Sequence, residues 1–231
     1  MRMKSSLIPG LTLILAMAGM SAEGYSQTRK AASSIPRIEV QNYNIEASLT
    51  PDAHELKAAA TVTFKALQPT DFVVFELSEN LSVQKILNSE GVEMEFRQDE
   101  TGPGSLSVRF AKPLSSGSEV TIKVEYQGGF DRDRFSRIYT RDESSAYIGM
   151  EGTCLLYSAK WFPINQFLVD RATGTVEVTV PLGLTVIGPG TEMPVITKGI
   201  SETFGWTAKT PFCPARLLRG NISRKRCSSA I

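Results

Sequence analysis

The chain has 231 residues, of which 42% are hydrophobic and 21% are charged, and its formal net charge is +1. These values are typical of a folded globular protein, and they exclude a wholly disordered chain, a collagen-like repeat and a multi-span membrane protein. Both ends are basic, +3 over residues 1–34 and +5 over residues 216–231, which leaves −7 for residues 35–215. A mildly acidic body argues against nucleic-acid binding, which requires a basic face.

Residues 1–24 have the pattern of a secretory signal peptide. Arg2 and Lys4 precede an uncharged apolar stretch over residues 7–20, and Ala22 and Gly24 fit a small-x-small cleavage site. The stretch is shorter than the roughly 20 apolar residues that a membrane span needs, although an uncleaved anchor is the alternative. We therefore expect export to the periplasm or the extracellular space, with no stable membrane span after cleavage.

Residues 25–36 are small and polar and end in a proline, which predicts a flexible lead-in. From Ile38 onward the apolar residues recur with period two, as in the strand-like run Val62-Thr63-Phe64, and a charged insertion over residues 128–146 interrupts this pattern. The expected strands, in chain order, cover residues 37–49, 60–67, 71–77, 81–87, 92–97, 105–110, 119–126, 174–181 and 203–208. Turn residues separate them, and no amphipathic helix of ten residues is found. The pattern predicts an all-β domain over residues 37–214, an antiparallel β-sandwich or a saddle of curved sheets.

The residues needed for catalysis are almost entirely missing. His54 is the one histidine, and although His54-Glu55 begins like the zinc motif HExxH, Ala58 stands where the second histidine is required. No nucleophile elbow, Walker loop or dinucleotide-binding glycine pattern occurs. We interpret His54 as a surface histidine in a turn between strands.

The three cysteines, Cys154, Cys213 and Cys227, have spacings that match no metal-binding pattern. Export would permit a disulfide between Cys154 and Cys213, and free buried thiols are the equal alternative. We expect no metal site.

Several short motifs occur in the order found in one known family. Ala159-Lys160-Trp161-Phe162-Pro163 is followed by Val180-Pro181-Leu182-Gly183, and Asn42-Tyr43-Asn44-Ile45 is followed by Pro51-Asp52. Together they resemble the N-terminal domain of the aminopeptidase N family of zinc metallopeptidases over residues 37–214. The resemblance implies a saddle-like β-domain that packs on a thermolysin-like catalytic domain, and that absent domain would hold the zinc.

The chain also departs from this family. It lacks both the Gly-x-Met-Glu-Asn substrate loop and HExxH, so the resemblance implies that it is inactive alone and carries no cofactor itself. Many members have a glutamine that touches the substrate amino terminus shortly before the Ala-Arg segment. Here the matching neighbourhood is Glu151-Gly152-Thr153, so Glu151 is the one candidate for substrate contact.

Residues 215–231 lack both alternation and acidic side chains, which predicts an irregular basic tail. A truncation or frameshift product is the favoured interpretation, because the family continues into its catalytic domain here. A native basic tail that binds membrane or acidic partners and an ordinary exposed terminus are the alternatives.

The leading hypothesis is the non-catalytic N-terminal domain of an exported zinc aminopeptidase-like protein, which would pack on a missing catalytic domain and wall its substrate cleft. The alternative is a stand-alone secreted β-sandwich for binding or adhesion, with a surface patch around residues 130–143 and Trp161-Phe162. The charged insertion 128–146 is interpreted as a solvated loop, and a charged contact surface for another domain is the alternative. A complete enzyme with unrecognised chemistry is the third hypothesis.

Overall fold

The computed structural model describes residues 35–99, 104–130, 146–150, 152–155, 161–165, 171–188, 190–212 and 220–224, all within one compact unit, Ile35–Ile231. The predicted signal peptide over residues 1–24 lies outside the described residues, as does nearly all of the lead-in. Within the described part, no helix has both the length and the apolar character to cross a membrane.

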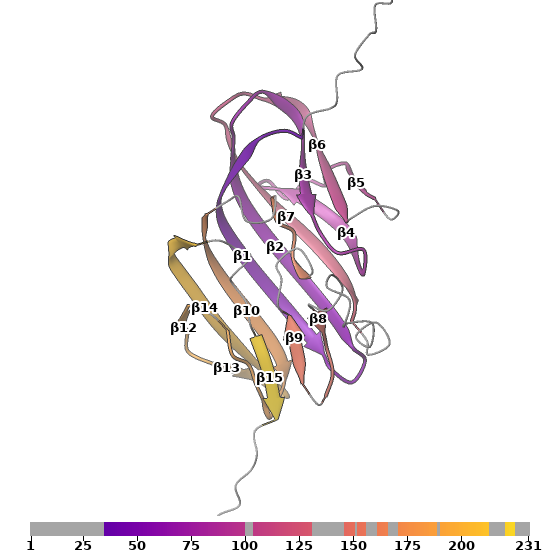
Figure 1. The fold of residues 1–231 in the computed structure, drawn as a ribbon, viewed down its shortest axis with the longest axis vertical. Coiled ribbons are helices and arrows are strands. Elements are labelled where there is room, and N and C mark those ends of the chain that lie inside the picture. Colours follow the sequence, from indigo (N-terminus) through magenta and orange to yellow (C-terminus); the bar gives the residue numbers. More distant parts are fainter. Residues whose placement is uncertain are drawn as a thin grey trace, which may run out of the picture. The chain divides into compact units, whose positions relative to one another are not determined.

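The described residues form three sheets (Figure 1), so the all-β prediction is confirmed. The eight-stranded sheet has the order β12-β14-β10-β1-β2-β7-β4, with β13 also paired to β14. Its strands are β1 (Ile38–Thr50), β2 (Glu55–Ala66), β4 (Leu81–Asn88), β7 (Glu119–Gly129), β10 (Ala172–Pro181), β12 (Thr191–Glu192), β13 (Ile196–Lys198) and β14 (Ser201–Phe212). The three-stranded sheet holds β3 (Thr70–Glu76), β6 (Ser105–Leu114) and β5 (Phe96–Gln98). The four-stranded sheet holds β11 (Leu184–Thr185), β15 (Gly220–Arg224), β9 (Thr153–Leu155) and β8 (Ala146–Tyr147).

One strand pair departs from the antiparallel expectation. β1 and β10 lie side by side in parallel, with Ile45 opposite Val176 (Figure 1), while the other described pairs are antiparallel. A parallel pair needs a long crossover connection, and here the chain builds five other long strands between the two.

The core lies on one face of the large sheet. Phe64 of β2 meets Phe75 of β3 edge to face at 6.0 Å between ring centroids, and it meets Phe110 of β6 at 6.4 Å. Because these contacts join the large sheet to the three-stranded sheet, the alternating apolar residues of both sheets form one continuous core.

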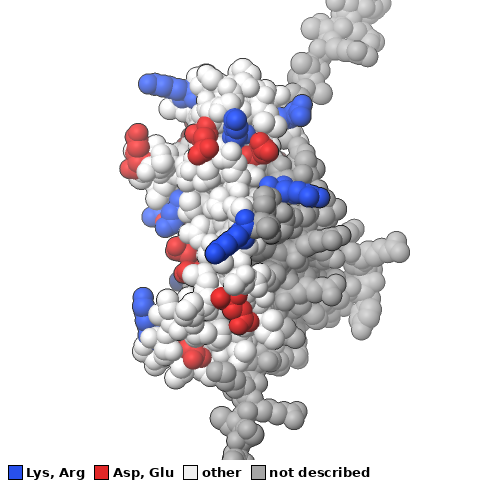
Figure 2. Space-filling view, turned by 90° about the vertical axis from the view of Figure 1, so that its left-hand side faces the viewer, with Lys and Arg blue, Asp and Glu red and all other residues white. Residues whose placement is uncertain are grey.

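The other face of the large sheet is polar. Threonine hydroxyls pair across its strands, Thr63 with Thr121 at 2.9 Å and Thr179 with Thr203 at 2.8 Å. Polar residues at alternate positions of the strands account for this polar face. The side of the molecule drawn in Figure 2, at 90° to the view of Figure 1, carries charges of both signs between uncharged residues.

Two segments differ from the strands or tail expected at those places. Residues 92–95, expected to be strand, cross from the edge of β4 to β6, where the Arg109 amide donates to the Glu95 carbonyl at 2.9 Å. In the segment expected to be an irregular tail, 220–224 form β15, which pairs with β9 and β11. Pairing on both edges satisfies the backbone groups of this short strand. The remainder of residues 215–231 lies outside the described residues.

Candidate functional site

The segment Trp161–Asn165 joins the two main sheets. Ile164 exchanges two backbone hydrogen bonds with Glu76 of β3, at 2.7 and 3.0 Å. On the other side, the Asn165 side-chain amide donates to the Ile38 carbonyl of β1 at 3.2 Å, and the Phe162 ring meets the Tyr43 ring edge to face at 5.7 Å. This segment therefore has a structural role at the centre of the domain.

The position of Trp161 and Phe162 overturns part of the alternative hypothesis. Trp161 is 1% exposed and Phe162 is fully buried, and the two rings contact each other at 4.8 Å between centroids. The surface patch expected at Trp161-Phe162 is therefore wrong, because two large aromatic side chains gain most by leaving water. Of the rest of that patch, Phe130 is 2% exposed and residues 131–143 lie outside the described residues.

Glu151, the expected substrate-contact residue, lies outside the described residues, but the residues on both sides of it are described. The Gly152 amide donates to the Gly149 carbonyl at 3.2 Å, and the Gly149 amide donates to the Thr153 hydroxyl at 3.3 Å. These hydrogen bonds close the turn around residue 151 locally, and on its C-terminal side Thr153 is buried and pairs with Ile222 of β15.

His54 fixes the strand that leads into this turn. Its Nδ1–H donates to the Ile148 carbonyl at 2.5 Å, and its ring lies 6.0 Å from the Tyr147 ring. The His54 carbonyl also accepts the Phe130 amide at 2.9 Å. The interpretation of His54 as a turn residue is confirmed, but the side chain is half-buried and links three segments rather than being a free surface group. The backbone of His54 has φ of 59°, which lies in the left-handed region, and no pattern in the sequence predicts this conformation.

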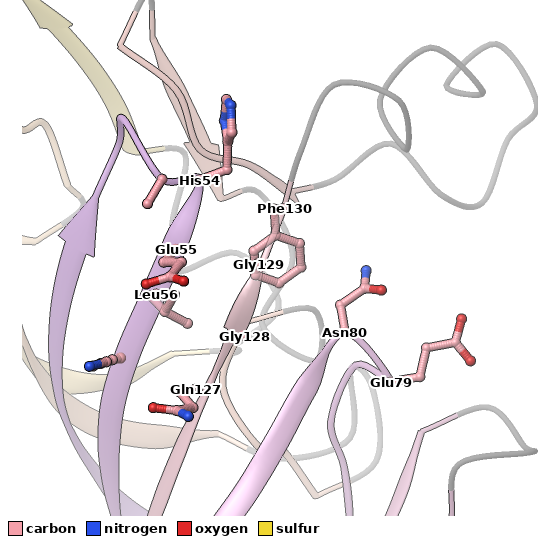
Figure 3. Close-up of a pocket in the computed structure, with 11 residues that line it drawn as sticks. His54, Glu55, Leu56, Glu79, Asn80, Gln127, Gly128, Gly129 and Phe130 are labelled. Atoms are coloured by element: carbon pink, nitrogen blue, oxygen red, sulfur yellow. The ribbon is translucent and has the colours of Figure 1, made fainter.

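An open pocket of about 570 Å³ lies beside His54 (Figure 3). Figure 3 shows the His54 ring pointing away from Glu55 and Gln127, and the pocket is also lined by Glu79 and Asn80 of the segment before β4. The described lining contains no hydroxyl or thiol side chain that His54 could activate as a nucleophile.

The described residues do not fit a zinc site. No group of three or more histidine, cysteine, aspartate or glutamate side chains in the described part of the chain could hold a metal ion. The disulfide considered between Cys154 and Cys213 stays a prediction, because Cys213 and the side chain of Cys154 lie outside the described residues.

Substitution of His54 should separate its hydrogen bond from its backbone conformation. His54→Ala is expected to lose about 1–2 kcal/mol of unfolding free energy, because the Ile148 carbonyl loses its donor. His54→Gly loses the same bond but relieves the left-handed backbone, so it should be about 1 kcal/mol more stable than His54→Ala. Urea unfolding of the two variants measures the difference, and equal stability of His54→Ala and the parent chain would contradict the role of the bond.

No protein-family model and no curated protein sequence matches this chain. Solved structures do match its fold. The M1 zinc metallopeptidase from Deinococcus radiodurans superposes with a TM-score of 0.68 at 20% identity, over 82% of this chain and 43% of that one. A mutant of that enzyme bound to a Tyr-Ser-Ala substrate gives 0.68 at 21% identity, and a two-domain M1 zinc metallopeptidase mutant bound to L-tryptophan gives 0.69 at 20% identity.

The chain spans less than half the length of these metallopeptidases. Identities near 20% establish likeness of fold, and that likeness confirms the resemblance that the sequence motifs indicated. The described domain has the fold of a β-rich part of the M1 zinc metallopeptidases.

Proposed function

We propose that this chain is the non-catalytic N-terminal domain of an exported zinc aminopeptidase-like protein. In this proposal it packs on a catalytic domain and walls the substrate cleft. The observation that carries the proposal is the extent of the structural match, which takes in 82% of this chain but 43% of a zinc metallopeptidase. The export step rests on the signal-peptide pattern of residues 1–24.

The zinc and the hydrolytic step would belong to the partner domain. HExxH needs two histidines one helical turn apart, and the whole sequence contains one. That histidine donates its Nδ1–H to a backbone carbonyl in a turn between strands. We therefore propose that the chain by itself neither requires zinc nor hydrolyses peptides.

Glu151 would be the contribution of this domain to the cleft. A carboxylate there would accept hydrogen bonds from the positively charged amino terminus of a peptide. The hydrogen bonds of Gly149, Gly152 and Thr153, together with the bond from His54 to Ile148, support this role because they anchor both flanks of the position. An anchored position preserves the geometry that substrate contact needs.

Apolar side chains are exposed at one end of the large sheet, as expected of a surface that another domain would cover. Leu182 is 57% exposed and Ile200 is 87% exposed, and the Leu182 amide donates to the Ile200 carbonyl at 2.8 Å. Two large exposed aliphatic side chains, on residues joined by a backbone hydrogen bond, would gain from burial against another domain.

Peptidase activity tests the proposal. The nucleotide sequence beyond the codon for Pro214 is translated in three frames, and any frame with HExxH is joined to this domain and expressed as one chain. With amino-acid p-nitroanilides and zinc, we expect no turnover by the chain alone and clear turnover by the joined chain. Glu151→Gln in the joined chain should raise KM about tenfold, since a charge-assisted bond becomes a neutral one.

Two results would contradict this function. Turnover by the purified chain alone would show that it is an enzyme in its own right. Absence of HExxH from all three frames, and from every neighbouring gene, would favour the stand-alone binding module. Glu151→Gln without effect on KM would remove only the proposed role of that residue.

A further inference from the structure

A groove of about 960 Å³ lies between the segment that follows β4, strand β6 and the start of β7. We call it the β6-edge groove. Its apolar lining includes Met94 and Val120, which are half-buried, and Phe110, which is 9% exposed. Val92, also in the lining, is 57% exposed. The groove therefore offers apolar surface that the domain itself leaves open.

One side of the groove is a strand edge. β5 pairs with β6 only opposite Leu106 to Val108, and the bond from the Arg109 amide to the Glu95 carbonyl follows directly. From Phe110 to Leu114, β6 continues without any described strand on that side. Unpaired strand edges accept a further strand, and Pro113, which has no amide hydrogen, limits how far such a strand could pair.

The rim of the groove is acidic. It carries Asp71 and four exposed glutamates, against Arg109 and Lys112 as the cations, and the glutamates are Glu90, Glu93, Glu95 and Glu119. Arg109 lies 3.8 Å from Asp71, whereas none of the four glutamates has an ion pair within the described part of the chain. These carboxylates are therefore available to cations from outside.

We propose that the β6-edge groove binds an extended cationic peptide segment, which adds a strand to the free edge of β6. Backbone hydrogen bonds to the edge give such binding its affinity, and alternate side chains give it specificity. In an extended peptide one set of side chains would lie on Met94 and Phe110. The other set, if lysine or arginine, would reach the unpaired glutamates, and the −7 charge of residues 35–215 would attract it from a distance.

Binding of a labelled peptide to the full chain tests this proposal. The probe is a hexapeptide of alternating lysine and valine with a fluorophore of zero net charge, followed by fluorescence anisotropy at low salt. The groove variant combines Glu93→Gln, Glu95→Gln and Glu119→Gln. The matched control combines Glu39→Gln, Glu55→Gln and Glu192→Gln, which are equally exposed and lie outside the groove. We expect about a tenfold weaker Kd for the groove variant and little change for the control.

A second peptide tests the strand edge separately from the charge. The same hexapeptide with alternate backbone amides N-methylated keeps its lysines but cannot donate to β6, so its binding should be lost. Equal weakening by the groove variant and the control would mean that only net charge matters, and it would overturn the proposal. Full binding by the N-methylated peptide, or no binding of the parent peptide at low salt, would overturn it as well.

Discussion

Phe162→Ala is expected to destabilise the domain by about 3–5 kcal/mol, a large part of the roughly 5–15 kcal/mol that holds a typical domain folded. Phe162 is fully buried, and its ring contacts both Tyr43 of β1 and the neighbouring Trp161. Its removal leaves a cavity beneath the Trp161–Asn165 segment. The backbone hydrogen bonds between this segment and Glu76 join the large sheet to β3. Both the lost burial and the cavity therefore fall at the junction between two sheets.

Urea unfolding followed by circular dichroism measures this effect. Phe162→Leu retains most of the volume and is expected to cost about 1.5 kcal/mol or less. Ile200→Ala is the surface control, because that side chain is 87% exposed and should change stability by less than about 0.5 kcal/mol. Similar midpoints for Phe162→Ala and Ile200→Ala would show that the Trp161–Asn165 segment does not hold the sheets together.

The strands of the large sheet could be predicted from sequence because one face of the sheet is exposed to solvent. Val62 and Phe64, expected to share a face, are fully buried, and Thr61 and Thr63, which alternate with them, are only partly covered. The same alternation holds for Val176, which is 2% exposed in β10. A period of two arises wherever a sheet separates core from solvent, so local sequence is enough to place these strands.

The pairing of strands that lie far apart in the chain is harder to predict from sequence than the strands themselves. The parallel register of β1 on β10 joins residues about 130 positions apart, as in Asn42 opposite Thr173, and no local pattern encodes that choice. The burial of Trp161 cannot be predicted from local sequence for the same reason. An aromatic pair between turn-rich stretches has no period, and its burial depends on Tyr43 and Glu76 arriving from distant strands.

The candidate site, like the fold, can be predicted from the sequence only in part. Glu151 is a candidate through the family resemblance alone, since an isolated glutamate carries no local signal in the sequence. The support of that position by His54 could not be foreseen, because it depends on a turn conformation with φ of 59° and on a contact 94 residues away along the chain. The tight turn before β2 suggested where His54 lies, but tertiary contacts determine what it does.

Gly104→Ala is expected to cost about 3 kcal/mol or more, because two separate constraints act at this residue. Gly104 has φ of +74°, a backbone conformation that an L side chain disfavours by about 1 kcal/mol. An added Cβ would also overlap the Leu77 carbonyl oxygen and lie 3.0 Å from its carbonyl carbon. The two backbones cannot separate freely, since the Leu77 amide donates to the Gly104 carbonyl at 2.7 Å.

Two further glycines allow the constraints to be measured one at a time. Gly91 has φ of +79° with no atom within 4 Å of an added Cβ, so Gly91→Ala should cost about 1 kcal/mol. Gly128 has no positive φ, but an added Cβ would overlap the Asn80 carbonyl oxygen at the junction of β4 and β7, so Gly128→Ala should cost about 2–3 kcal/mol. Urea unfolding should therefore rank Gly104→Ala as the most damaging and Gly91→Ala as the least. If Gly104→Ala and Gly91→Ala cost the same, backbone conformation alone requires glycine at residue 104, and the close approach to Leu77 does not.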